Sequence, residues 1–364
     1  MDTAFPFGLP LPTAFYLTVY VVTLVIHVVF MNYVLAGTAT VAAAYLVGGR
    51  ARDGDGVRLL KDWMPLMLSG AITAGVAPLL FVQILYKQEF YTANLLLFNR
   101  WMAILPVLII GFYALYLLKS GWLGRQSGWV KGVVAAVPIL AVAFTGYSWT
   151  ENHLLSLRGP DFWGRFYATG SQLYTEPQLL PRLLMWAVGS VPTMAVILGW
   201  QLWYHGVGRP RRLALFAVAG LALVGASAGW YSLVADAATR AAFVSPLATP
   251  YFVAASLGVA LQVIGWLWVA RGTQFQARRL IVPTAGVLLT IGGMTVCREA
   301  VRIAAIGPDR FAALFPIHAT AFGRGGFVVF LAFFALNAGL VALVFWLVRH
   351  RARPGSGAEG TGGG

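Results

Sequence analysis

Long apolar stretches alternate with short polar connections along the whole chain. Each apolar stretch approaches or exceeds the about 20 residues that a helix needs to cross a bilayer. This pattern predicts an all-α, polytopic integral membrane helix bundle of about nine transmembrane helices. The nine stretches cover roughly residues 13–48, 64–86, 101–118, 130–149, 180–204, 212–235, 250–270, 280–303 and 326–348.

The connections carry nearly all of the charge, and no repeat of fixed period stands out. We therefore expect one transmembrane helical domain over residues 1–353. The segment 354–364 is rich in glycine and poor in apolar residues, which predicts a disordered tail. The first residues, MDTAFPFGLPLP, lack the positive charge that begins a cleavable signal peptide, so we expect the first apolar stretch to be retained as a span.

Composition supports a membrane protein and excludes a water-soluble globule. Hydrophobic residues make up 59% of the 364 residues and charged residues only 10%, against about 25% charged in a soluble domain. The surface of a soluble protein could not accommodate this balance. With one cysteine, Cys297, the chain has no intrachain disulfide and no Cys-x-x-Cys-His site for covalent haem attachment.

The net charge of +14 is distributed as a topology signal. Every second connection is basic, and together with the C-terminal end these connections hold sixteen of the 26 basic residues and four of the twelve acids. Basic loops remain in the cytoplasm, so the pattern predicts the N-terminus outside and the C-terminus inside a bacterial-type plasma membrane. It also makes nucleic acid an unlikely partner, with membrane lipid the expected one. The basic connections are 49–62, 119–131, 205–212 and 271–279.

The opposite, outer face has the longer connections, around 87–100, 150–180 and 298–325, and these mix acids, arginine, histidine and aromatic residues. Loops longer than a helical hairpin needs tend to have a function. We find no phosphate-binding glycine loop and no His-Glu-x-x-His zinc motif. Acidic residues are almost absent from the centres of the stretches, which argues against a proton-coupled transporter.

His27 is the one histidine of five that lies deep in an apolar stretch, in VIHVVFMNYVLAG. An ionisable side chain at that depth is costly and is a candidate functional residue. Imidazole is a standard axial ligand of haem iron, and bundle interiors hold such cofactors. The alternative is a neutral histidine that hydrogen-bonds across helices, to Asn32 or to a backbone carbonyl.

Three polar clusters close apolar stretches on the outer side, the side nearer to His27. In the third cluster, Arg298 and Arg302 are four residues apart, so a carboxylate or a haem propionate could bridge them. The alternatives are an ion pair with Glu299 and arginines that extend to the interface. The members are Gln83, Tyr86, Lys87 and Glu89 in the first cluster, Trp149, Glu151, Asn152 and His153 in the second, and Arg298, Glu299 and Arg302 in the third.

Four segments, in this order and topology, carry a resemblance to a known family. They are HVVFMNYVLAG, GVAPLLFVQILYKQEFY, WTENH and the arginine-rich CREAVR before the last stretch. Over most of its length the chain resembles subunit I of the cytochrome bd-type quinol oxidases. The resemblance implies a pair of four-helix bundles with a peripheral helix, haems near the outer face, and His27 as a haem iron ligand.

The chain departs from this family where the family binds its other groups. Gln83 and a position near Asn99 stand where the family has glutamates, and a position near Met185 stands where it has a low-spin haem histidine. The quinol-binding loop between the sixth and seventh stretches shrinks to about a dozen residues. We therefore expect that the chain alone does not oxidise quinol or reduce oxygen.

The resemblance and the departures together lead to one expectation. The chain is expected to be a membrane subunit of a respiratory or other electron-transfer complex that binds one b-type haem and meets a c-type cytochrome or other redox subunit on the outer face. The alternative is a haem-free membrane anchor or transporter-like scaffold. The candidate cofactor-binding residues are His27, Met185, Gln83, Arg298 and Arg302, and the other outer-face candidates are Lys87, Glu89, Glu151, Asn152, His153 and Glu299.

Overall fold

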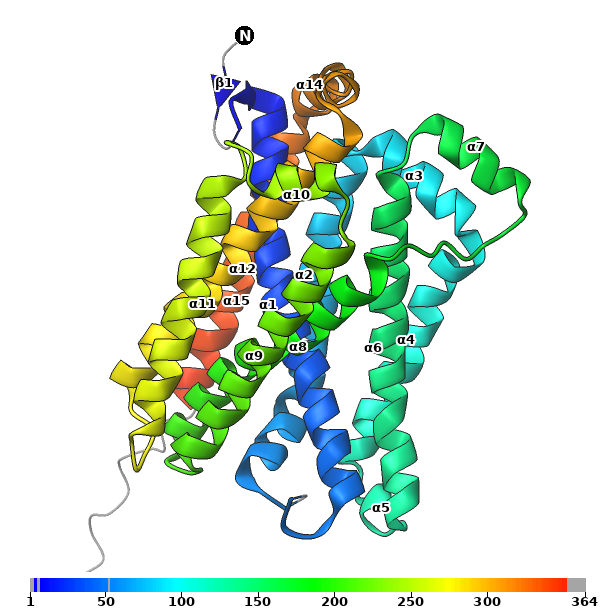
Figure 1. Ribbon diagram of the computed structural model, residues 1–364. Coiled ribbons are helices and arrows are strands. Elements are labelled where there is room, and N and C mark those ends of the chain that lie inside the picture. The colour runs from blue at the N-terminus through cyan, green and yellow to red at the C-terminus, as the bar shows by residue number, and fades with distance from the viewer. Residues whose placement is uncertain (1–2, 5–6, 52, 352–364) are drawn as a thin grey trace, which may run out of the picture.

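The computed structural model describes residues 3–4, 7–51 and 53–351, and long helices dominate it (Figure 1). By length and composition, eight of these helices could cross a membrane, and a bent pair of helices near the C-terminus makes a ninth crossing if it counts as one span. The long helices are α1 Leu11–Val47, α2 Asp55–Leu85, α4 Phe98–Lys119, α6 Gly128–Ser156, α8 Leu179–His205, α9 Pro210–Val234, α11 Thr249–Ala270, α12 Ala277–Ile306 and α15 Phe327–Arg351.

The short elements gather mainly at the end of the bundle where α1 begins, which we call the N-terminal end (Figure 1). The other end has only brief connections. The short elements are β1 Thr3–Ala4 paired with β2 Leu9–Pro10, η1 Gly49–Ala51, α3 Lys87–Leu96, α5 Gly121–Gly124, α7 Pro160–Ala168, α10 Ala237–Phe243, α13 Pro308–Ala312, α14 Phe315–Ala321 and η2 Phe322–Gly326. The connections that are long in sequence thus form one structured cap, and the basic connections lie at the opposite end.

The predicted all-α, multi-pass membrane bundle is confirmed, with two differences. The connection before the last predicted stretch is itself helical, and its segment 308–325 meets the segment 328–337 at 63°. The second helix begins at Asp55, nine residues before the predicted apolar stretch, so Arg58 and Lys61 lie on its first turns and not in a loop. Hydropathy locates the membrane-embedded part of a helix, whereas hydrogen bonding continues into the polar flank. The predicted tail 354–364 lies outside the described residues.

Glycines set the closest helix contact, between α11 and α12. A Cβ at Gly286 would stand 2.7 Å from the backbone oxygen of Gly258, and a Cβ at Gly258 would stand 2.5 Å from Thr290 Oγ1. Gln262 Nε2 donates to Thr290 Oγ1 at 2.9 Å across the same contact. Association of membrane helices relies on such close backbone packing and on interhelical hydrogen bonds, because lipid provides no hydrophobic driving force.

Candidate functional site

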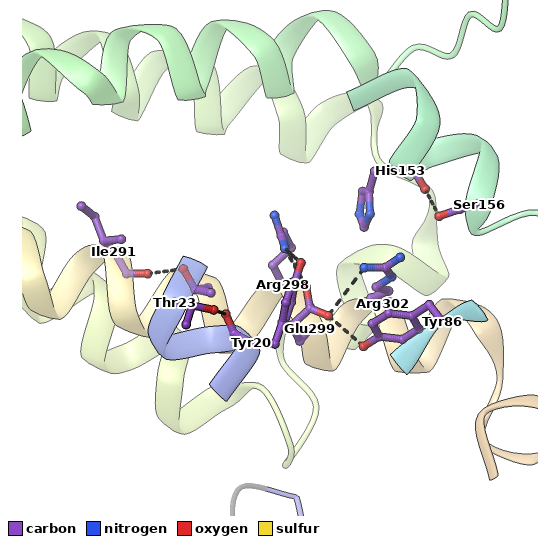
Figure 2. Close-up of polar contacts among 10 residues, drawn as sticks. Tyr20, Thr23, Tyr86, His153, Ser156, Ile291, Arg298, Glu299 and Arg302 are labelled. Atoms are coloured by element: carbon purple, nitrogen blue, oxygen red, sulfur yellow. Dashed lines mark hydrogen bonds and ion pairs between the residues drawn. The ribbon is translucent and has the colours of Figure 1, made fainter. Parts of the chain in front are cut away.

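Glu299 is the centre of a polar cluster at the N-terminal end of the bundle (Figure 2). Its carboxylate is fully buried and accepts hydrogen bonds from Arg298 Nη2 at 2.8 Å and from the hydroxyl of Tyr86 at 2.8 Å. Arg298 Nη2 also donates to the hydroxyl of Tyr20 at 2.7 Å. One carboxylate therefore links α12 to the end of α2, and its arginine neighbour links α12 to α1.

Arg302 is almost fully buried but makes no hydrogen bond to the part of the chain that the structure describes. Its exposed fraction is 3%, and its Nε atom is buried and unpartnered. Its nearest carboxylate oxygen, Oε2 of Glu299, is 3.8 Å from Nη1, beyond hydrogen-bond distance. The guanidinium instead lies over the ring of Tyr86, 3.6 Å from the centroid. A buried guanidinium usually has its donors satisfied, so Arg302 is prepared for a further acceptor.

The cluster has an excess of positive charge. His153, half-buried on the last turns of α6, points toward Arg302 (Figure 2). Arg298 and Arg302 thus share a single carboxylate, that of Glu299. Such a buried imbalance favours the binding of an anion, which would satisfy charge and hydrogen bonds together.

Tyr86 owes its position to the end of α2. The helix stops at Leu85, and Tyr86 leaves the helical conformation with φ −135° and ψ 47°. Burial, followed by the negative charge of Glu299, raises the pKa of Tyr86 well above its ordinary value. The phenol therefore stays protonated and donates to Glu299. Gln83 does not join this contact, since it accepts from the hydroxyl of Tyr91 at 3.1 Å on the outside of the bundle.

His27 lies half-buried on α1 and faces α2. Its Nδ1 is 2.8 Å from the backbone oxygen of Ala71. A carbonyl can only accept, so Nδ1 carries the proton, and Nε2 of the neutral ring keeps its lone pair. Metal-ligating histidines commonly donate their other nitrogen to a carbonyl in this way. Of the two expected partners, the backbone carbonyl is the correct one, because Asn32 donates to Thr193 instead.

The neighbourhood of His27 depends on a glycine. A Cβ on Gly75 would stand 2.9 Å from Cε1 of the imidazole, so only glycine at this position leaves room for the ring. Met185 is half-buried on α8, next to Trp186, which packs against the central apolar core. No described hydrogen bond or ion pair joins His27 to Arg298 or Arg302.

The remaining acids of the outer-face clusters are buried ion pairs of their own. Glu89 pairs with Arg310 at 3.3 Å, and its second oxygen is buried without a hydrogen bond within the described chain. Glu151 is fully buried, accepts from the backbone N–H of Tyr174 at 2.7 Å, and lies 3.2 Å from Arg100 Nε. These pairs attach α3, α13 and the 157–178 connection to the bundle.

The other two predicted residues lie apart from the Glu299 cluster. Asn152 is buried and donates to Asn94 on α3 at 2.6 Å. Lys87 is exposed as the first residue of α3. Of the sequence-predicted candidates, the structure therefore brings together Arg298, Glu299, Arg302 and His153. Met185, Gln83, Lys87, Glu89, Glu151 and Asn152 occupy other places.

Two residues of the cap were missed as candidates. Tyr20 is one, and its only sequence signal is its position seven residues before His27 on the same helix. His318 is the other: it lies on the last turn of the short helix α14 and is fully buried. Its Nδ1 lies 2.9 Å from Thr13 Oγ1, and its Nε2 lies 3.2 Å from the backbone oxygen of Leu85. A histidine in a short helix gives no sequence sign of this inward orientation.

The function of this chain has to be inferred from these residues. No protein-family model matches the chain, and no curated protein is similar to it. Among the residues that the structure describes, no group of three or more histidine, cysteine, aspartate or glutamate side chains could hold a metal ion. Haem iron needs only one or two axial protein ligands, so a haem site does not require such a group. The residues that bear on a haem site are His27, as the iron ligand, and the arginines, as partners of the propionates.

Proposed function

We propose that this chain is the membrane subunit of a respiratory or other electron-transfer complex in a bacterial-type plasma membrane, and that it binds one b-type haem through His27. The observation that carries the proposal is the His27 ring, whose Nδ1 is engaged by the Ala71 carbonyl while Nε2 keeps its lone pair. A bound b-type haem supplies one-electron chemistry. The protein's own contributions are to ligate the iron, to hold the propionates and to limit access of water.

The fit of His27 is supported by both of its neighbours on α2. The Ala71 carbonyl fixes the tautomer and the plane of the imidazole, as second-shell acceptors do in metal sites. The imidazole packs directly against the backbone at Gly75, where a side chain would displace it. Both features lie on one face of α2, four residues apart, so a single helix orients the proposed ligand.

The arginine cluster is suited to the propionates. Arg298 bonds to Tyr20, and Tyr20 precedes His27 by seven residues on α1. At 1.5 Å per residue, the arginines therefore lie ~10 Å closer to the N-terminal end than the proposed ligand. Arg302, with its unpartnered Nε, would donate to one carboxylate, and Arg298 would share its donors between Glu299 and another.

A redox partner would meet the chain at the N-terminal end, where the structured cap and the arginine cluster lie. The expected partner is a c-type cytochrome or another redox subunit on the outer face. Electron transfer needs proximity and orientation, and the arginine cluster would hold the haem edge toward this cap. The orientation of the chain in the membrane rests on the basic connections at the opposite end.

The alternative function, a haem-free anchor or scaffold, is favoured by one observation. The bond between His27 and Ala71 already satisfies one ring nitrogen by linking two helices, which is how a purely structural histidine would be used. A scaffold would need no ligand for Nε2 and no anion at Arg302. The two functions therefore differ in a measurable content of haem.

The test is the haem content of the full chain, purified in mild detergent from cells supplied with haem precursor. A pyridine haemochrome assay should give one b-type haem per chain, and the dithionite-reduced minus oxidised spectrum should show the paired visible bands of haem b. Arg302→Gln should weaken haem retention while leaving the iron ligand in place. A colourless protein, purified folded and in good yield, would favour the scaffold.

A further inference from the structure

A cleft of about 380 Å³ opens at the N-terminal end, between the start of α3 and the helix that precedes the last span. Its lining contains two cations and no acid, and the volume is within the range of small-molecule sites. It is separate from the Glu299 cluster and from His27. The lining residues are Lys87, Pro316, Ile317, Thr320, Ala321 and Arg324.

One face of α14 and its continuation form most of the cleft. Ile317, Thr320, Ala321 and Arg324 recur at helical spacing of three or four, so they lie on the same side. Lys87 stands across from them as the first residue of α3. His318 lies on the other side of α14 and is fully buried.

The two walls are tied together behind the cleft. His318 Nε2 bonds to the backbone oxygen of Leu85, a carbonyl that the end of α2 leaves without a helical partner. Lys87 follows Leu85 by two residues, so the same bond that fixes α14 also fixes the position of Lys87 relative to Arg324. Thr13 on α1 holds the other nitrogen of His318 at 2.9 Å. The backbone positions from which the two cations extend are therefore set by the fold.

The charges of the cleft are uncompensated within the described chain. Neither Lys87 nor Arg324 lies within 4 Å of a carboxylate there, whereas the nearby Glu89 is buried against Arg310. Thr320 Oγ1 donates its proton to the backbone oxygen of Pro316 at 2.8 Å, so the donors left for an anion are those of Lys87 and Arg324. Two neighbouring cations without counter-charge favour the binding of an anion, and arginine with lysine suits a phosphate group.

Apolar surface continues from the cleft. Ile317 lines it and is 38% exposed, and Val328 and Leu331 of the following span are 65% and 43% exposed. These residues stand where a polar connection meets an apolar helix, at the level of a lipid headgroup. A pair of basic side chains beside a membrane helix attracts an anionic headgroup electrostatically, as basic pockets on the cytoplasmic side of membranes do. A phosphate at the cations would leave acyl chains along the exposed side of α15.

We propose that this cleft is a specific binding site for the phosphate group of an anionic phospholipid, held between Lys87 and Arg324. The lipid would stabilise the bend before the last span, because it contacts both the end of α2 and the segment that turns into α15. This site does not depend on haem, so it can fail or hold independently of the proposed function.

The test uses the full chain in nanodiscs and native mass spectrometry of the lipids that it retains. In mixed phosphatidylcholine and phosphatidylglycerol, the chain should retain phosphatidylglycerol preferentially. Lys87→Gln and Arg324→Gln should each weaken that retention about fivefold, the effect of one cation near a lipid surface. Lys87→Arg should restore it. Arg165→Gln removes an exposed charge from α7 at the same end and should change retention less than twofold.

Three outcomes would overturn the proposal. Equal retention of the two lipids would remove the selectivity, and an equal loss in the Arg165 variant would reduce it to general surface charge. The third outcome concerns the source of the phosphate. If inorganic phosphate binds the detergent-purified chain and the Lys87 variant abolishes that binding while lipid preference is absent, the cleft takes free phosphate and not lipid.

Discussion

Replacing Glu299 by glutamine should destabilise the protein more than any other single loss of a carboxylate at its N-terminal end. Glutamine keeps the size of the side chain and can still accept from Tyr86, but it removes the negative charge that faces Arg298 and Arg302. Removing one partner of a buried ion pair costs about 3–5 kcal/mol, since the other charge is left uncompensated. Arg298 is 39% exposed, so water partly solvates the charge that is left unpaired. We therefore expect a loss of about 3 kcal/mol in the free energy of unfolding.

The measurement is equilibrium unfolding in mild-detergent micelles with increasing sodium dodecyl sulfate, followed by circular dichroism. Asp55→Asn is the matched control, because Asp55 pairs with Arg58 at 3.0 Å on an exposed helix start, where such pairs contribute less than about 1 kcal/mol. Adding Arg302→Gln to the Glu299 variant should recover part of the loss, because the uncompensated guanidinium is then removed as well. A Glu299 variant as stable as the Asp55 variant would refute the reasoning.

Further variants test the packing, the topology and the chemistry. Gly286→Ala should cost about 1–3 kcal/mol by overpacking against the Gly258 carbonyl, whereas Gly292→Ala, on the same helix with open space around it, should be neutral or stabilising in the same assay. A reporter inserted at Gly170 should be detected outside the cell and one at Gly208 in the cytoplasm; a cytoplasmic signal from Gly170 would contradict the nine-span topology. Met185→Ala should leave the haem spectrum unchanged, since a methionine in an apolar helix usually packs rather than ligates. The purified chain should not consume oxygen with a short-chain quinol, and a rate within about tenfold of an authentic bd-type oxidase would contradict this expectation.

The membrane helices could be predicted from the sequence because bilayer thickness sets their length. The absence of water from the bilayer core also requires apolar side chains and a fully hydrogen-bonded helical backbone. The basic connections and the longer ones also separate to opposite ends, as their alternation requires. The bend before α15 could not be predicted in this way. The helix breaks at Gly325, and hydropathy gives neither the helical form of 308–325 nor its 63° angle to the next segment.

The candidate site was only partly predictable, for a similar reason. Arg298, Glu299 and Arg302 are neighbours on one helix, so their contact follows from helical spacing. The bond between Tyr86 and Glu299 joins residues 213 positions apart, and no local pattern indicates it. The contact of His27 with the Ala71 backbone is equally hidden, because a backbone carbonyl can belong to any residue type.

The most direct measurement of the central claim is chemical rescue of His27. We predict that His27→Gly, purified in the folded state, loses the haem b difference spectrum and that added imidazole restores it by occupying the vacated ligand position. His205→Gly, which alters an exposed histidine at a helix end, should keep the spectrum without imidazole. A His27→Gly protein with an unchanged spectrum would contradict the assignment of His27 as the haem ligand.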